Sequence, residues 1–316
     1  MTVLTGRAGK AGKAGKTAAD RRPSARKRLA GERAWAIGFA SPYLLHLVAL
    51  AAWPLLASLW FSMTDYDLVS SPKFIGFDNF VRMFNDGLFW RTLGNTAYFA
   101  VLFVPTQTAL ALGLAIALNQ RLRGMALFRA AYFVPVVSSW VVVAYVADAV
   151  FNPQTGLANQ VLDFFGLPAE NWLQDPALVI PTLAAVAVWK GVGYMMVLFL
   201  AGLQAIPEER YEAAKIDGAS AWNRFRYITL PGISGTTFLV LVLTSIETLQ
   251  SFEQVFVMTD GGPHGASELT VLHLYRQGFQ FFQMGYASAI AWVLFVLVLA
   301  LTLVQFRLQR RWVHYA

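Results

Sequence analysis

Long apolar stretches alternate with short polar segments along the 316 residues of the chain. A helix needs about 20 apolar residues to cross the ~30 Å hydrocarbon core of a bilayer, and six stretches reach that length. Lipid offers no hydrogen bonds to an open backbone, so segments that span it must be helices. The pattern therefore predicts an all-α polytopic membrane protein with six transmembrane helices, near residues 35–62, 93–119, 125–150, 178–203, 232–258 and 284–307.

The composition agrees with this fold class and excludes several kinds of site. Hydrophobic residues make up 57% of the chain and charged residues 14%, with a mean hydropathy of +0.50, which leaves too little polar surface for a soluble domain. Because the chain has no cysteine, it forms no disulfide and carries no thiolate. No metal-ligand spacing links the four histidines, which are His46, His264, His273 and His314. We therefore expect neither a metal site nor a catalytic residue.

The basic residues are distributed unevenly between the loops. Twenty of the 25 Lys and Arg residues lie in the N-terminal tail, the segment joining the second and third spans, the loop 204–231 and the C-terminus. The positive-inside rule places these segments, and so both termini, in the cytoplasm. The loops 63–92 and 151–177 are then extracytoplasmic. Topology, with some attraction to anionic membrane lipid, thus explains the net charge of +7, and no nucleic-acid partner is indicated.

The first 34 residues form a basic tail of low complexity, which repeats Ala-Gly-Lys three times over 8–16. Such a composition predicts a disordered cytoplasmic tail (1–34), followed by the transmembrane domain (35–316). The apolar region that follows the tail exceeds the usual ~7–15 residues of a signal peptide, so we expect a retained first span. Gly15-Lys16-Thr17 resembles the end of a P-loop, but the first glycine of that motif would fall at Lys10. The sequence predicts no ATP site in this chain.

A polar stretch lies between the fourth and fifth spans, at residues 212–231. It follows the spacing E-A-A-x3-G-x9-I-x-L-P, whose defining positions are Glu212, Ala213, Ala214, Gly218, Ile228, Leu230 and Pro231. The two alanines lack bulk, so a partner surface can come close. Glu212 offers a negative charge to an Arg or Lys across an interface. The alternative is an ordinary cytoplasmic linker with helical propensity.

Local signals predict two short helices in this loop. Pro207 followed by two glutamates is a good helix start, because the carboxylates lie at the positive end of the helix dipole. Gly218 can adopt the left-handed conformation that ends a helix. Ser220 is expected to cap the second helix, and Pro231 to end the loop where the fifth span begins.

With these motifs the chain resembles the permease subunits of ABC sugar importers of the maltose/glycerol-phosphate type, in particular the first of the two permeases. Further matching segments are Asn152 to Leu162, Trp189-Lys190, Leu200 to Leu203, Val257 to Pro263 and Met284 to Ala289. The E-A-A loop is specific to ABC importers in general, and the Gly-Gly-Pro segment is typical of the carbohydrate group.

The resemblance implies the partners and the roles of several residues. It implies a heterodimer with a second homologous permease, two ATP-binding subunits that carry ATP and Mg, an extracytoplasmic solute-binding protein, and a bacterial inner-membrane location. The residues implied to couple to the ATPase are Glu212, Ala213, Ala214, Asp217, Gly218, Ile228, Leu230 and Pro231. Those implied to lie on the binding-protein side are Gly261, Gly262 and Pro263. The cargo would be a di- or oligosaccharide, an amino sugar or a glycerol phosphate.

Ionisable and amide groups within the spans mark a candidate substrate path, since they are costly in lipid. The residues we select are Lys190, Glu247, Gln250, Ser251 and Gln254. On a continuous helix, Glu247 and Gln250 share one polar stripe with Ser251 and Gln254. Carboxylates and amides suit sugar hydroxyls. The stripe could instead join neighbouring helices, Lys190 could form an ion pair with Glu247, and the adjacent Trp189 is better explained by packing.

Two other classes of protein explain the sequence less well. A self-contained secondary transporter would need coupling-ion sites and internal repeats, and it would leave the E-A-A loop without a role. A membrane enzyme would need a nucleophile with its base or a metal cluster, and the sequence offers neither.

Overall fold

The computed structural model describes residues 25–120 and 124–313, and these are almost entirely helical. The chain divides into two compact units, residues 1–57 and 58–316. The first unit holds α1 (Ala25–Leu47), the π-helical turn η1 (Val48–Ala52) and the start of α2 (Trp53–Ser62). Most of the predicted disordered tail lies outside the described residues. Its last part is helical from Ala25, since the sequence there is rich in the strong helix formers Ala, Arg, Lys and Leu.

Four helical segments of the described chain are long and apolar enough to cross a membrane. They are Ile37–Ser62, α4 (Gly87–Leu118), α8 (Val179–Gln204) and α15 (Met284–Gln309). Two bent helix pairs raise the number to six if each pair is one span. The predicted fold class is thus confirmed, although the spans predicted near 125–150 and 232–258 are not single straight helices.

The first bent pair is α5 (Met125–Val137) and α6 (Trp140–Phe151), which meet at an angle of 104°. Pro135 lies in the last turn of α5, and α6 starts anew with Ser139 as its N-cap, where the hydroxyl accepts a hydrogen bond from the Val142 amide. A proline and a serine cap close together favour one helix ending and another beginning.

The second bent pair precedes and includes the predicted fifth span. The short segments α10 (Ala221–Arg224), η2 (Phe225–Thr229) and α11 (Leu230–Gly232) meet α12 (Ser234–Leu249) at 65°. The helix then stops, and α13 (Glu253–Met258) is separate. Near this break the hydroxyls of Thr248 and Ser251 donate to the carbonyls four residues earlier, a type of bond that often bends helices.

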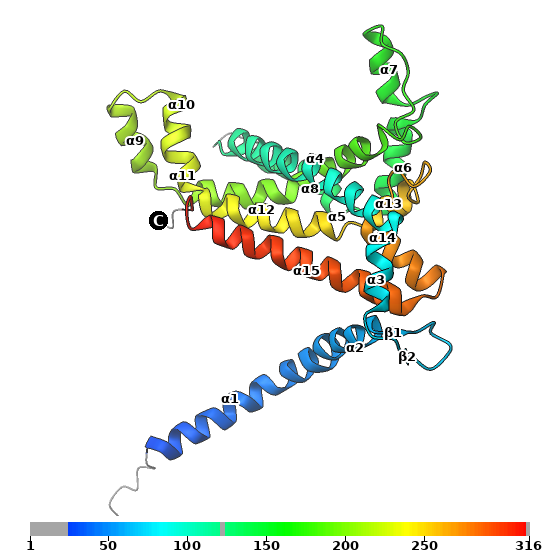
Figure 1. The fold of residues 1–316 in the computed structure, drawn as a ribbon. Helices are drawn as coiled ribbons and strands as arrows, with labels where there is room; N and C mark the ends of the chain where they lie inside the picture. The colour runs from blue at the N-terminus through cyan, green and yellow to red at the C-terminus, as the bar shows by residue number, and fades with distance from the viewer. Residues whose placement is uncertain (1–24, 121–123, 314–316) are drawn as a thin grey trace, which may run out of the picture. The chain divides into compact units, whose positions relative to one another are not determined.

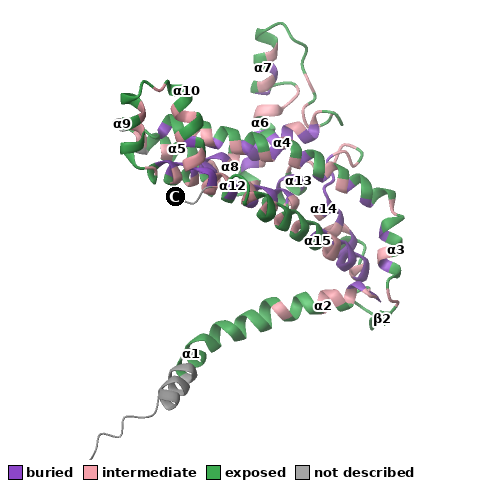
Figure 2. Ribbon diagram, turned by 60° about the vertical axis from the view of Figure 1, so that its left-hand side comes forward, coloured by how far each residue is buried: buried purple, intermediate pink, exposed green. Residues whose placement is uncertain are grey.

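The core forms where α4, α8 and α12 pack together, as the buried residues in Figure 2 show. Of the 18 consecutive residues that are most apolar in α8, 61% are buried. The corresponding share is 28% in α4 and in α15, so α8 is the central helix. A small residue lets α8 and α12 approach closely, because a Cβ on Gly202 of α8 would clash with the hydroxyl oxygen of Thr236 on α12, at a distance of 2.3 Å.

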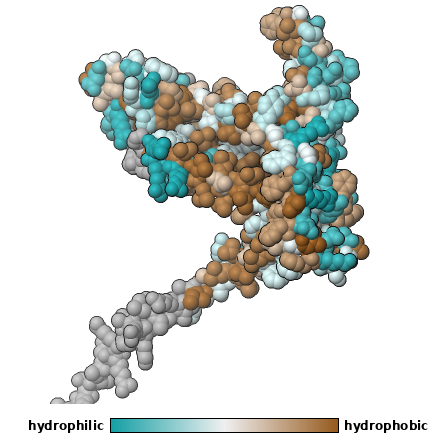
Figure 3. All heavy atoms as spheres, in the orientation of Figure 1, coloured by the Kyte–Doolittle hydropathy of each residue, from teal (hydrophilic) through white to brown (hydrophobic). Residues whose placement is uncertain are grey.

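Short elements gather at the two ends of these helices (Figure 1). One end carries α9 (Glu208–Ile216) with α10. The other end carries further short elements, among them the antiparallel strands β1 (Thr64–Asp65) and β2 (Lys73–Phe74), α3 (Asp78–Phe84), α7 (Leu157–Phe164), α14 (Thr270–Tyr275) and η3 (Arg276–Gln280). On the face drawn in Figure 3, hydrophobic side chains lie between two more hydrophilic ends, as expected for a protein set in a bilayer.

Candidate functional site

The E-A-A segment forms the exposed helix α9 at one end of the central helices. The helix begins directly after Pro207 and carries two acidic residues in its first turn and Lys215 in its last, in agreement with its dipole. Glu212 and Ala213 are exposed, and Ala214 is half-buried. The side of α9 with the motif is therefore open to a partner.

Gly218 ends this helix as its sequence predicts. It has φ +75° and follows Asp217, the C-cap residue, which is exposed. The amide of Ala219 then donates to the carbonyl oxygen of Ala214 over 2.8 Å, a closing bond typical of a left-handed helix end. Ser220 caps α10 by accepting from the amide of Asn223. The chain thereby reverses, and α9 and α10 form a helical hairpin.

The last three motif residues lie on the return leg of this hairpin. Ile228 is in η2 and half-buried, Leu230 is exposed, and Pro231 is half-buried in α11. Large hydrophobic side chains that the motif does not include are also strongly exposed on the hairpin, among them Ile216 by 87% and Trp222 by 63%. The sequence analysis did not select these two residues, although each is a large apolar residue in a loop that contains many polar residues.

Lys190, in the middle of α8, contacts the bend between α5 and α6. Its ammonium donates to the carbonyl oxygen of Val136 over 3.1 Å and reaches that of Pro135 at 3.5 Å. It also lies 5.1 Å from the ring centre of Trp140. Carbonyls at a helix end lack intrahelical donors and carry partial negative charge, so a cation stabilises them. Among the described residues no ion pair within 4 Å joins Lys190 to Glu247, so the alternative of a structural ion pair between them is not supported.

The polar residues of the predicted fifth span divide into two groups. Glu247 and Gln250 are exposed, whereas Ser251 and Gln254 are buried. The predicted single stripe assumed a continuous helix, but α12 ends at Leu249 and Gln254 belongs to α13. Of the four residues of the predicted stripe, the structure therefore leaves Glu247 and Gln250 accessible.

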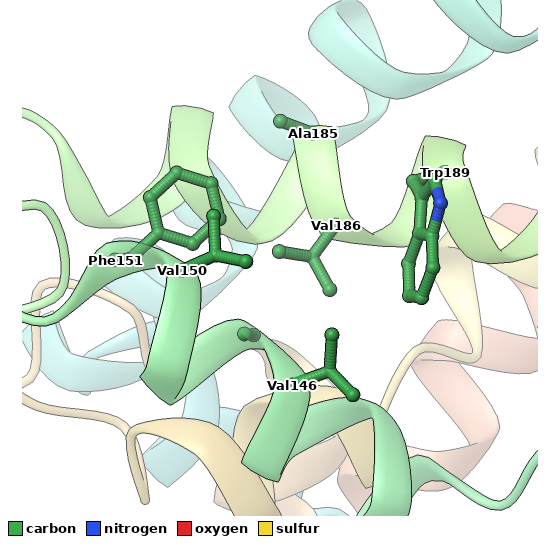
Figure 4. Close-up of a pocket in the computed structure, with 7 residues that line it drawn as sticks. Val146, Val150, Phe151, Ala185, Val186 and Trp189 are labelled. Atoms are coloured by element: carbon green, nitrogen blue, oxygen red, sulfur yellow. The ribbon is translucent and has the colours of Figure 1, made fainter. Parts of the chain in front are cut away.

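An apolar pocket of about 330 Å³ lies between α6 and α8, next to the candidate path (Figure 4). The residues that line it are Val146, Ala147, Val150, Phe151, Ala185, Val186 and Trp189. The indole of Trp189 forms one side of the pocket and is 47% exposed. These surroundings are apolar, so the contacts of Trp189 within this chain are packing contacts.

The Gly-Gly-Pro loop at the opposite end from α9 has a defined shape. Gly261 has φ +76°, and the carbonyl oxygen of Gly262, which precedes Pro263, accepts from the hydroxyl of Ser267 over 2.6 Å. The guanidinium of Arg276 donates to the carbonyl and carboxylate oxygens of Asp260 at 2.6 and 3.0 Å.

Arg276 and the N-terminal part of α4 hold the rest of this loop. Arg276 also donates to the Glu268 carboxylate at 2.9 Å. Two side chains of α4 donate to backbone carbonyl oxygens of the loop: Arg91 to that of His264 at 2.7 Å, and Asn95 to that of Glu268 at 3.0 Å. The loop therefore presents a fixed surface.

A buried charged cluster that the sequence analysis missed lies beneath the same loop. His273 is 1% exposed, and its ring nitrogens lie 3.3 Å from the Glu268 carboxylate and 3.9 Å from that of Asp86. Tyr286 donates to Asp86 over 2.7 Å. Burial opposes ionisation of Glu268, but the His273 hydrogen bond and the Arg276 charge outweigh it, and the pKa of this carboxyl is lowered. The pKa of Asp86 is lowered too: burial raises it, but the Tyr286 hydrogen bond and the Leu88 amide prevail.

Comparison with known proteins gives the family. Residues 107–314, more than half of the chain, match the family described as binding-protein-dependent transport system inner membrane component. The chain belongs to this family. The match includes α8, the α9–α10 hairpin, α12 and the Gly-Gly-Pro loop, so the resemblance inferred from the motifs is confirmed, and the chain is a multi-pass membrane protein.

Curated relatives in this family are named as permeases. The probable ABC transporter permease protein YesP of Bacillus subtilis is 37% identical over 282 residues, covering 88% of this chain and 91% of that protein. The trehalose/maltose transport system permease protein MalF of Thermococcus litoralis is 34% identical, covering 85% and 91%. The lactose transport system permease protein LacF of Rhizobium radiobacter is also 34% identical, covering 90% and 96%.

Solved structures of similar fold come from ABC importers. A chain of a bacterial transporter involved in the import of the acidic polysaccharide alginate superposes with a TM-score of 0.78 at 25% identity, covering 90% of this chain and 99% of that chain. A second alginate transporter structure, in complex with an alginate pentasaccharide-bound periplasmic protein, gives the same TM-score at 24% identity, a likeness that shows the fold alone.

Proposed function

We propose that this chain is a permease subunit of an ATP-driven importer and contributes to the translocation path for a carbohydrate delivered by an extracytoplasmic binding protein. The observation that carries the proposal is the α9–α10 hairpin, an exposed helical surface attached directly to α8 and α12, the helices that bear Lys190 and Glu247. A surface so attached can pass the movement of a docked partner to the polar membrane residues.

The proposed partners follow from the two ends of the molecule. At the cytoplasmic end, α9 docks on one of two ATP-binding subunits, which hold ATP and Mg. A second, homologous permease completes the path as a heterodimer. At the extracytoplasmic end, the loop around Gly261, Gly262 and Pro263 meets the binding protein. The chain lies in a bacterial inner membrane with both termini in the cytoplasm, as the distribution of Lys and Arg supports.

The proposed path uses Glu247 and Gln250 as its accessible polar groups, with Ser251 and Gln254 behind them and Lys190 at the neighbouring helix bend. An exposed carboxylate at this depth cannot face lipid without a large cost, so it faces the path or the second permease. Carbohydrate cargo is supported by the names of the relatives, which include trehalose/maltose, lactose and arabinooligosaccharide permeases. Disaccharides, oligosaccharides, amino sugars and glycerol phosphates all remain within this class.

Purification of the tagged full-length chain from its own membrane in mild detergent tests the proposal. We expect an ATP-binding subunit and a second permease to co-purify, and the preparation to hydrolyse ATP. Substitution of the motif residues Glu212 to Ala214 by bulky residues should abolish recovery of the ATP-binding subunit while the chain remains in the membrane. Uptake by the purified chain alone, driven by an ion gradient, would instead identify a secondary transporter.

A further inference from the structure

One hydrogen bond closes the α9–α10 hairpin. The phenol oxygen of Tyr211, in the first half of α9, lies 3.0 Å from the hydroxyl oxygen of Thr229, the last residue of η2. Thr229 is 7% exposed and Tyr211 is half-buried, so this pair is partly shielded from water. A shielded hydrogen bond contributes more than one exposed to competing solvent. The pair therefore ties the outgoing and return legs of the loop together.

The return leg leads into α12 through a 65° bend, and a hydrogen bond links the two sides of this bend. The carbonyl oxygen of Thr229 accepts a hydrogen bond from the amide of Ile233 at 3.0 Å, directly before α12. The connection after α8 packs on the same segment, since a Cβ on Gly232 would lie only 2.8 Å from Ile206. Thr229 thus belongs to a rigid base formed by the end of α8 and the start of α12.

By contrast, α9 is attached to the chain at two points that can act as hinges. It follows Pro207 and ends at Gly218, which has φ +75°. A hollow of about 260 Å³ adjoins α9 and includes Tyr211 and Thr229 in its lining, so α9 has room to tilt. The Tyr211–Thr229 pair is a hydrogen bond that opposes such a tilt.

From this arrangement we propose that Tyr211 is a positioning residue, which makes α9 and α12 move as one rigid body when the ATP-binding subunits close. The inference rests on the proposed function. With the pair intact, movement of α9 reaches α12. Without it, the movement is absorbed as a tilt of α9 about Pro207 and Gly218.

Because the chain has no cysteine, the test can use two introduced cysteines that carry spin labels. We place them at Lys215, near the end of α9, and Leu239 on α12, both of which are exposed. The interlabel distance is measured in the complete purified complex, with and without Mg, ATP and vanadate. We expect one narrow distance that nucleotide does not change. In Tyr211→Phe, which lacks only the hydroxyl, the distribution should broaden and shift when nucleotide is added.

Matched variants separate this role from general damage. Thr229→Ser keeps the hydroxyl and should behave as the unaltered protein, whereas Thr229→Val should reproduce Tyr211→Phe, and the double variant should be no worse than either. Tyr227→Phe removes a hydroxyl from the same loop, on a residue 69% exposed, and should have no effect. A narrow, unchanged distance in Tyr211→Phe would overturn the inference, as would a nucleotide-dependent shift in the unaltered protein. Failure of any ATP-binding subunit to co-purify would refute the proposed function instead.

Discussion

The ammonium of Lys190 donates a 3.1 Å hydrogen bond to the carbonyl oxygen of Val136, so a side chain from the middle of α8 stabilises the end of α5. This contact gives an intramembrane lysine a structural partner within its own chain. It also fixes the position of the bend from which α6 starts.

Loss of this contact should destabilise the transporter. Lys190→Met leaves the carbonyls at the end of α5 without their cation, at an expected cost of about 1–3 kcal/mol. Lys190→Arg keeps a cation and should retain most of the stability. Thermal unfolding of the purified complex measures the difference. An unchanged melting temperature together with a raised KM for uptake would show that Lys190 acts on the substrate and not on the bend.

The cluster around His273 predicts a dependence of stability on pH. The pKa values of Glu268 and Asp86 are lowered in the folded protein, from ordinary values of 4.5 and 3.8. In acid the unfolded chain therefore binds more protons than the folded chain does. The contribution of these two carboxylates to the stability of the fold is complete at neutral pH, and it is lost as the pH falls below about 4.5 and through their pKa values in the folded protein.

The variant Glu268→Gln isolates this contribution. It should lower the melting temperature at pH 7 and reduce the further loss on acidification, because one of the two carboxyls no longer titrates. Asp163→Asn, at an exposed carboxyl of α7, serves as the control and should leave the pH profile unaltered. A profile for Glu268→Gln that parallels the unaltered protein would contradict the role assigned to the cluster.

Gly218 offers a test of coupling that does not disturb packing. A Cβ at this position would meet no atom within 4 Å, so a larger residue is opposed only by φ +75°. Valine should cost roughly 1–2 kcal/mol there, whereas asparagine tolerates the left-handed region. We expect Gly218→Val to lose uptake while ATP hydrolysis persists, and Gly218→Asn to keep both. Equal uptake in the two variants would exclude a requirement for this backbone conformation.

The polar groups of α12 can be tested as a substrate path. Glu247→Leu and Gln250→Leu should each reduce uptake at least several-fold, while the ATP-binding subunits and the second permease still co-purify. Exposed side chains contribute little to the folding of the chain, so its yield should not change. Loss of the second permease from the preparation would support interhelical contact instead, and normal uptake kinetics would remove both residues from the path.

Features set by local chemistry could be predicted from the sequence, because their causes lie within a few residues. Gly218 ends α9 and Ser220 caps α10 as expected. The length of an apolar run, however, does not reveal a bend, and the 104° angle between α5 and α6 was missed although Pro135 and Ser139 mark it.

Contacts between distant segments could not be predicted from one sequence. The predicted polar stripe of the fifth span assumed one continuous helix, but α12 ends at Leu249, so the stripe residues belong to different segments. Asp86 and His273 are far apart along the chain and come together only when α4 packs against α14. Lys190 was selected from the sequence as a candidate substrate-path residue, but its partner within this chain, the end of a helix, exists only because α5 stops at Val137.

Site-specific photocrosslinking in intact membranes tests the central claim most directly. A photoreactive residue replaces either Ile216, which is 87% exposed at the end of α9 and is not a motif residue, or Phe164, which is 84% exposed on α7 at the other end of the molecule. We expect the residue at position 216 to capture an ATP-binding subunit, identified by mass spectrometry, and the residue at position 164 to capture none. Capture of that subunit from position 164, or its absence from position 216 in membranes that import the substrate, would contradict the account.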